Sequence, residues 1–440
     1  MIGKSPDQNQ MNLFKPLLKE FINLKHELVM LAETIDWKYF ENLFSGMYSE
    51  TGQPSVPIRM MVGCLMLKRL YNYGDETLAS AWIMNPYMQY FCGEAHFQHK
   101  FPCDPSDFVH FRKRIGENGI EAIFTYSVNL HGNEAKSKMV LSDTTVQENN
   151  TTFPTDSKLA KKIIDKIAKI ARQESITQRQ SYKRKSKQLL RETFNSKHPK
   201  RIRKAQKAQK KLKTLAGRVV KELEKKLPNH VLNLYTEELA IYKQVLAQEK
   251  LTENKIYSLH KPFTACIAKG KAHKKYEFGN KIGLMINPKS LVILGIESFE
   301  GNPHDGKTIE PLLNQMKMNL NYQPHEVIYD RGGRGQSEIN GVKISTPKPT
   351  KKSYSAYQKR KIRQKFRRRA AIEPVIGHLK TDFRMAQNYL HGRASPKINA
   401  MLAAIGWNLK KKMEKLKLEL LQLFSFFFSN DCKTILFLSS

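Results

Sequence analysis

The chain has few cysteines and no long apolar segment. Its 440 residues include five scattered cysteines, too few for a disulfide framework: Cys64, Cys92, Cys103, Cys266 and Cys432. The longest apolar stretches, 420–429 and 434–438, are interrupted by polar residues and are too short to span a bilayer. The first ten residues are polar and contain no apolar signal core. We therefore expect a cytoplasmic protein with no membrane partner.

Acidic residues are also scarce. The chain contains 40 Asp and Glu against 75 Lys and Arg, a formal net charge of +35. The excess is concentrated, since residues 157–226 hold 25 Lys and Arg against 5 acids, and residues 343–369 hold 12 against none. A solvated surface normally mixes the two signs, so these stretches predict a polyanionic partner, most simply nucleic acid. The absence of an aromatic RNP-like motif disfavours an RNA-binding protein.

The length predicts two or three domains, the first of them helical. Residues 1–135 show apolar positions at helical spacing, and Pro57 suits the first turn of a helix over 58–70. A turn at 71–74 and a short helix over 76–84 follow. This arrangement is either a helix-turn-helix that docks on DNA or part of a plain helical bundle. We expect 1–135 to serve DNA binding or dimerisation.

A cysteine- and histidine-containing segment follows these helices. Its four zinc-ligand residue types are more closely spaced than in common structural sites: Cys92, His96, His99 and Cys103. The alternative is a pair of buried cysteines with two loop histidines.

Strand character begins at residue 138. Residues 138–145 predict a short strand that delivers Asp143 at its end, and residues 326–330 predict a second strand that ends in Asp330. Further strands are expected over 276–285, 290–298 and 342–346, with a helix over 307–320. Between the first strand and the rest, residues 157–250 predict a basic helical insertion with an apolar stripe. The fold class is therefore α/β.

The basic helix that follows leads into Glu373. On a helical wheel, Arg369, Glu373, Gly377 and Lys380 fall on one face, which combines a lone acid, two cations and a glycine notch. Pro374 disfavours helical geometry at Glu373, so a new helix begins near it or the helix is kinked. The argument that these residues share one helix face is weaker if the helix breaks between Arg369 and Glu373. Ordinary surface ion pairing is the alternative.

Asp143, Asp330 and Glu373 are the candidate catalytic and metal-binding residues. Three converging carboxylates repel one another and need divalent cations, most naturally Mg²⁺ or Mn²⁺. Two such ions about 4 Å apart can activate an oxygen nucleophile and stabilise the leaving oxygen at a phosphodiester. The alternatives are local, because Asp143 can cap a turn beside Thr144 and Asp330 can make an Asx turn before Gly332.

Nearby cations would hold DNA phosphates, and we expect this role for five residues: Lys365, Arg367, Arg368, Arg369 and Lys380. His304 and Asp305, in a loop between strands, are either ligands of metal or DNA or an ordinary polar loop, which we prefer.

The motifs Asp143-Thr144-Thr145, Asp330-Arg331-Gly332 and Arg369-x3-Glu373-x6-Lys380 resemble those of the DDE transposases of bacterial insertion sequences. The last is similar to the Y-x2-R-x3-E-x6-K signature of the insertion-sequence five family. The likeness covers about residues 50 to 410. It departs at Phe366, where the signature has tyrosine, so the hydroxyl hydrogen bond is missing.

The resemblance implies a ribonuclease-H-like core, a mixed sheet with flanking helices, over 136–410, followed by a C-terminal tail over 411–440. It also implies Mg²⁺, or Mn²⁺, and a homo-oligomer that acts on double-stranded DNA in a bacterial, nucleoid-associated setting. Such an enzyme cuts the terminal inverted repeats of a transposon and joins them to target DNA. The alternative is an inactive or repurposed transposase that only binds DNA.

Overall fold

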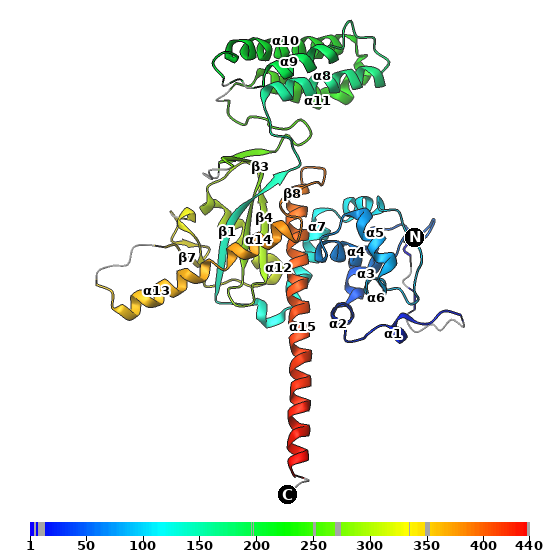
Figure 1. The fold of residues 1–440 in the computed structure, drawn as a ribbon, viewed down its shortest axis with the longest axis vertical. Helices are drawn as coiled ribbons and strands as arrows, with labels where there is room; N and C mark the ends of the chain where they lie inside the picture. Colours follow the sequence, from blue (N-terminus) through cyan, green and yellow to red (C-terminus); the bar gives the residue numbers. More distant parts are fainter. Residues whose placement is uncertain are drawn as a thin grey trace.

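The computed structural model describes residues 1–3, 6–7, 14–194, 196, 198–249, 252–268, 274–333, 335–347 and 353–437, with side chains up to 422. Cys432 and the last residues of the expected tail therefore lie outside the described side chains, as do residues 348–352 of the basic stretch. Figure 1 shows a four-helix module, a central sheet and a group of N-terminal helices, with a long C-terminal helix that passes between the last two.

The N-terminal region is helical, as expected. Its helices are α1 (Leu18–Phe21), α2 (Glu27–Thr34), α3 (Trp37–Ser45), α4 (Ile58–Leu70), α5 (Asp75–Met84), α6 (Pro86–Phe91) and α7 (Asp107–Asn129). Helix α4 begins directly after Pro57 and is buried along most of its length. Helix α7 is interrupted at Gly116, whose φ of 61° requires a glycine, and then continues. The helix-turn-helix role of α4 and α5 stays a prediction.

In the described part of the chain the sheet has eight strands: β1 (Met139–Asn149), β2 (Ala265–Ala268), β3 (Tyr276–Ile286), β4 (Ile293–Phe299), β5 (Glu326–Ile328), β6 (Glu338–Ile339), β7 (Val342–Ser345) and β8 (Gln387–Asn388). The order is β2-β3-β1-β5-β7-β6, with β4 beside β3 and β8 beside β1. Strands β1, β3 and β4 are antiparallel neighbours, whereas β1, β5 and β7 run parallel.

Strand β1 is longer than the sequence suggested. We expected Asp143 at the end of a short strand, and this was wrong because β1 continues to Asn149. Its antiparallel partner β3 pairs with it from Leu141 to Glu148 and so carries the strand past Asp143. On the opposite edge, however, the pairing with β5 stops at Leu141.

Helices cover the sheet and link it to the N-terminal region. They are η1 (Gly132–Ala135), η2 (Asp305–Thr308), α12 (Ile309–Leu320), η3 (Arg331–Gly333), α13 (Ala356–Arg369), α14 (Ile372–Thr381) and α15 (Ser395–Phe437). Helix α15 packs against α4, α7 and β4 and then projects beyond the body (Figure 1). It crosses residue 411 without a break, and Met413 is still buried. A separate tail over 411–440 stays a prediction.

The described residues form two separate hydrophobic cores. The first joins the N-terminal helices, the sheet and α15. The second lies inside the insertion, which consists of α8 (Asp156–Gln173), α9 (Lys183–Glu192), α10 (Ile202–Lys226) and α11 (Asn229–Ala247). Ile167, Leu212 and Tyr242 are completely buried in this second core. None of the helices in the described part of the chain has the length and apolarity needed to cross a bilayer.

Two cores predict two unfolding transitions. Leu212→Ala should lower the free energy of unfolding of the helical module by about 2–5 kcal/mol, because it leaves a cavity among completely buried neighbours. The three tryptophans, Trp37, Trp82 and Trp407, all lie in the first core. The thermal transition followed by tryptophan fluorescence should therefore stay unchanged while a transition in helical circular dichroism moves down. The control is Leu234→Ala on α11, since Leu234 is 79% exposed. If Leu212→Ala shifts the fluorescence and circular-dichroism transitions equally, the two cores do not unfold separately.

Candidate active site and nucleic-acid interface

The pairing of β1 with β5 brings two of the expected acids together. Leu141 pairs with Ile328 as the last pair of this parallel ladder. Asp143 and Asp330 each lie two residues further along their chains, Asp143 within β1 beyond its last pair with β5, and Asp330 just after the end of β5. The next strand on this edge, β8, pairs only with Glu148 and Asn149. The candidate site lies in the interval between β5 and β8, where α14 packs against β1.

Both aspartates also make the local hydrogen bonds that we considered as alternatives. Asp143 Oδ1 accepts from the Thr144 backbone N–H at 2.7 Å. Asp330 Oδ1 accepts from the Gly332 backbone N–H at 2.8 Å, an Asx-type contact. These bonds fix the orientation of each carboxylate and use one oxygen of each. The other oxygen of Asp143, Oδ2, lies 3.3 Å from Arg369 Nη1.

Glu373 reaches the same place through Arg369. Helix α13 ends at Arg369 and α14 begins at Ile372, so the break lies between Arg369 and Glu373, the case that weakens the single-face argument. The two side chains nevertheless meet, because Arg369 Nη2 donates to Glu373 Oε1 at 3.3 Å. One guanidinium therefore bridges Asp143 and Glu373. The Gly377 notch opens to free space within the described structure.

A fourth carboxylate, Asp305, completes the cluster. Its Oδ1 accepts from Thr144 Oγ1 at 3.0 Å and from Lys281 Nζ at 2.9 Å. A Cβ added to Gly332 would lie 2.5 Å from Asp305 Oδ2 and 2.9 Å from Asp330 Oδ1, so these two oxygens flank the same small space. The choice between a ligand of metal or DNA and an ordinary polar loop stays a prediction for Asp305. His304 is exposed and only accepts from the Gly306 backbone.

Tyr329 is buried beneath these carboxylates. Burial, and then the nearby negative charges of Asp305 and Asp143, raise the pKa of its phenol well above the usual range. The ring therefore stays neutral and supports the site without adding charge. Its hydroxyl lies 3.4 Å from Thr308 Oγ1 at the end of η2.

The donor set suits a hard divalent cation. Carboxylate oxygens are the ligands that Mg²⁺ and Mn²⁺ prefer, and a protein cation, Arg369, already stands between Asp143 and Glu373. Across the described residues, no three His, Cys, Asp or Glu side chains lie close enough together to hold a metal ion. Metal binding thus requires Arg369 to leave the two carboxylates and Glu373, whose side chain is 63% exposed, to turn inward.

Three of the four residues considered for zinc contact other groups. Cys92 is buried with its Sγ 3.7 Å from Cys64 Sγ. The His96 ring nitrogen Nδ1 lies 3.1 Å from the Pro16 carbonyl oxygen, and the His99 ring contacts Phe97. Cys103 is only partly buried, so the alternative of two buried cysteines fits Cys92 but not Cys103.

The expected phosphate-binding cations divide into two groups. Lys365 forms an ion pair with Glu326 at 2.5 Å, and Arg368 Nε donates to the Pro288 carbonyl at 2.7 Å, so both anchor α13 to the sheet. Arg367 is exposed on α13, and Lys380 is partly buried on α14. Phe366 packs its ring against the first core. The sequence pattern did not separate the cations that hold α13 in place from the others.

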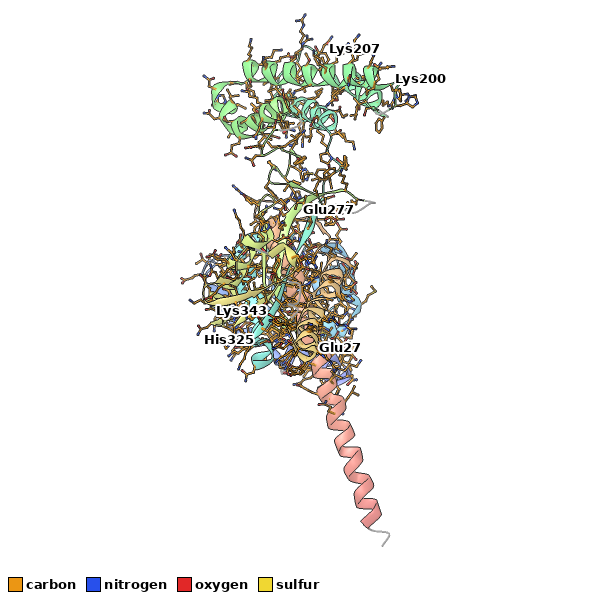
Figure 2. All side chains as sticks on the ribbon, turned by 90° about the vertical axis from the view of Figure 1, so that its left-hand side faces the viewer. Glu27, Lys200, Lys207, Glu277, His325 and Lys343 are labelled. Carbon is orange, nitrogen blue, oxygen red and sulfur yellow. The ribbon has the colours of Figure 1, made fainter. Side chains whose placement is uncertain are left out.

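The helical module carries a second cationic surface. A cavity of about 670 Å³ is lined by Arg179, Arg218, Lys221 and Lys225, with Glu222 as its acid. Glu222 is itself satisfied, since it accepts from the Arg179 backbone at 2.7 Å and from Lys226 at 2.8 Å. Figure 2 places Lys207 of α10, and Lys200 just before it, on the side of the module that faces away from the sheet.

Comparisons with known proteins indicate the family of this chain. Residues 16–114 match the family described as a transposase domain (DUF772), and residues 253–409 match the family described as a transposase DDE domain. A Rhizobium meliloti protein described as "Uncharacterized protein ORF8 in nfe locus" is 38% identical over 187 residues, 41% of this chain and 90% of that protein. No solved structure matches this chain.

The class that these matches define is the DDE transposase. This chain belongs to that family of transposases. Residues 115–252, which contain the basic helical module, lie outside both matched segments.

The contact between Asp305 and Lys281 predicts a stability effect. Asp305→Asn should lower the free energy of unfolding by about 1–3 kcal/mol, because Lys281, which is 7% exposed, is left without its counter-charge. Denaturant unfolding followed by tryptophan fluorescence measures this decrease. The double variant with Lys281→Met removes both charges and should recover most of it. If the double variant is as unstable as the sum of the two single variants, the ion pair is not the cause.

Proposed function

We propose that this protein cuts DNA at the ends of a transposon and joins those ends to target DNA. The observation that carries the proposal is the β1–β5 register, whose last pair lies two residues before both Asp143 and Asp330, together with Arg369, which links Asp143 to Glu373. The antiparallel order β4-β3-β1 followed by parallel β5 and β7 supports the ribonuclease-H-like core that the resemblance implies.

In this proposal, the three catalytic carboxylates, Asp143, Asp330 and Glu373, are positioned in different ways. Asp143 and Asp330 hold fixed orientations through their backbone hydrogen bonds. Glu373 lies on the first turn of α14 and is free to turn toward them. Asp305 is a positioning residue, because it ties Thr144 of β1 to Lys281 of β3. The neutral Tyr329 beneath them closes the apolar side of the site.

Asp143, Asp330 and Glu373 would hold Mg²⁺ or Mn²⁺. When bound, these ions supply Lewis-acid stabilisation of charged oxygens and lower the pKa of a coordinated water or hydroxyl. Arg369 then turns from the carboxylates to the scissile phosphate, where its planar guanidinium forms bidentate contacts. Lys380 and Arg367 contact neighbouring phosphates from α14 and α13.

DNA binding is shared between the site and the helical module. The excess of cations on α8–α11 supports a sequence-independent grip on flanking DNA, with affinity that falls as salt rises. We also propose that the protein acts as a homo-oligomer, because joining two ends of one element requires that both be held together.

Removal of a single carboxylate charge tests the chemistry. Asp143→Asn, Asp330→Asn and Glu373→Gln should each lower Mg²⁺-dependent cleavage of a terminal inverted-repeat duplex by at least about a thousandfold, since each removes a charge that the ions need. Duplex binding, measured by fluorescence anisotropy, should stay within about threefold of wild type. His304→Ala is the matched control, with an unchanged cleavage rate.

Cleavage that survives any of the three carboxylate variants would refute the proposed chemistry. Binding without cleavage in the wild type, at any divalent cation tested, would instead identify a protein that only binds DNA.

The module's contribution is measured by the salt dependence of binding. The triple variant Lys204→Gln, Lys207→Gln and Lys211→Gln removes three exposed cations of α10. The slope of log affinity against log salt should fall by up to about 0.9 for each DNA phosphate that these lysines neutralise in the wild type. Lys38→Gln, Lys100→Gln and Lys317→Gln make the matched control, because these exposed residues lie outside the module and carry the same charge. Equal slopes for the two triple variants would show that the module does not bind the phosphates.

A further inference from the structure

A cavity of about 580 Å³ lies where the N-terminal helices meet the sheet domain. Its walls come from α4, α7 and the segment between β8 and α15. The cavity is distinct from the carboxylate cluster, since it contains none of those acids. Nothing in the proposed chemistry uses its side chains.

Buried cations dominate one end of this cavity. Lys68, Arg69 and Arg112 are 7%, 3% and 8% exposed, respectively. One carboxylate, Asp75, serves two of them: it accepts from Lys68 Nζ at 2.5 Å and from both terminal nitrogens of Arg112 at 3.1 and 3.2 Å. The other acid of the wall, Glu117, pairs with Lys397 at 2.8 Å. Positive charge therefore exceeds negative charge in a poorly solvated place.

Arg69 is the least satisfied of these cations. Its terminal nitrogens donate to the Phe383 carbonyl at 3.2 Å and to Asn399 Oδ1 at 2.7 Å, neither of which carries charge. Its Nε is buried and lacks a hydrogen-bond partner among the described residues. Burial, and then the charge of Arg112, lower the pKa of Arg69 to about 9 and that of Lys68 to about 7. A buried N–H donor without an acceptor lowers the stability of the fold, and an anion bound at Arg69 would supply that acceptor.

The rest of the wall supplies a further cation and an apolar surface. Arg384 holds a φ of 60°, unusual for a residue with a side chain, and is fixed there by donation to the Asn72 carbonyl at 3.0 Å. Leu390 and Ile398 also line the cavity and give it apolar surface. The Tyr389 ring is 55% exposed at the opening. A small inorganic anion would leave this apolar side unused.

We propose that this cavity binds an organic phosphate of nucleotide size. The phosphate contacts Arg69, Arg112 and Arg384, and the base lies on the apolar wall with Tyr389 against its face. The volume suits a single nucleotide rather than a duplex, because ligand cavities of about 300–1,000 Å³ enclose small molecules. A free nucleotide and an unpaired nucleotide at the end of a DNA strand share this chemistry; the second source rests on the proposed function.

Isothermal titration calorimetry on the full chain, with deoxyadenosine monophosphate, inorganic phosphate and deoxyadenosine as probes, tests the proposal. The monophosphate should bind with one-to-one stoichiometry and more tightly than either fragment. Lys113 of α7 is an exposed cation that also lines the cavity and adds to its positive potential. Arg384→Gln and Lys113→Gln should each weaken the binding about tenfold or more. Tyr389→Ala should weaken the monophosphate by about fivefold or more while leaving phosphate binding unchanged.

Two controls separate this cavity from other cationic surfaces. Arg393→Gln removes an exposed arginine close in sequence that pairs with Glu300, and it should leave the binding unchanged. The α10 triple variant should also have no effect. If neither the monophosphate nor phosphate binds, or if Arg384→Gln, Lys113→Gln and Arg393→Gln bind alike, the proposal is wrong.

Competition then identifies the source of the nucleotide. A duplex with an unpaired 3′ end that displaces the monophosphate, where a blunt duplex does not, supports a strand end as the ligand. Monophosphate binding that survives both duplexes supports a free nucleotide. Since none of these measurements involves cleavage, their failure would leave the proposed transposase chemistry untouched.

Discussion

The parallel pairing of β1 with β5 is the constraint on which the candidate site depends. Leu141 pairs with Ile328, and Asp143 and Asp330 each lie two residues beyond this last pair in their chains. Because successive side chains alternate between the two faces of a strand, a slip of one residue would turn one of these carboxylates away. Strand β3 opposes such a slip, since it pairs with β1 from Leu141 to Glu148 and buries Leu284 opposite Asp143.

Near the paired strands β1 and β5, basic side chains of the protein neutralise the charges of the acidic side chains. Arg369 serves Asp143 and Glu373, and Lys281 serves Asp305. The first arrangement is open to exchange because Glu373 is largely exposed, whereas Lys281 is buried and makes a permanent contact. In the proposed function, metal ions would take the place of Arg369 beside these two carboxylates, and a DNA phosphate would pair with Arg369, without disturbing Asp305. In the cavity lined by Lys68, Arg69 and Arg112, by contrast, the basic side chains outnumber the acidic ones.

Local patterns predicted the elements but not their contacts. Pro57 marked the start of α4, and the stripe through Ile163 and Ile167 marked the module, because both signals act within one helix. Asp305 and Lys281 lie 24 residues apart, and their contact exists only after β3 and η2 pack together. Lys68 and Arg69 end an apolar run, and only packing of α7 and α15 against α4 shows that they are buried.

The helical module is connected to β1, the strand that carries Asp143. The chain leaves β1 at Asn149 and returns to β2, which pairs with β3 beside the end of β1. Asn149 Nδ2 donates to Thr264 at 2.9 Å and to Asn280 at 3.1 Å, closing this base with side chains of both strands. Lys261, 2% exposed, donates to the Asn388 carbonyl at 2.7 Å, and burial lowers its pKa to about 8. In the proposed function, DNA bound by the module would be connected to Asp143 through the one continuous strand β1.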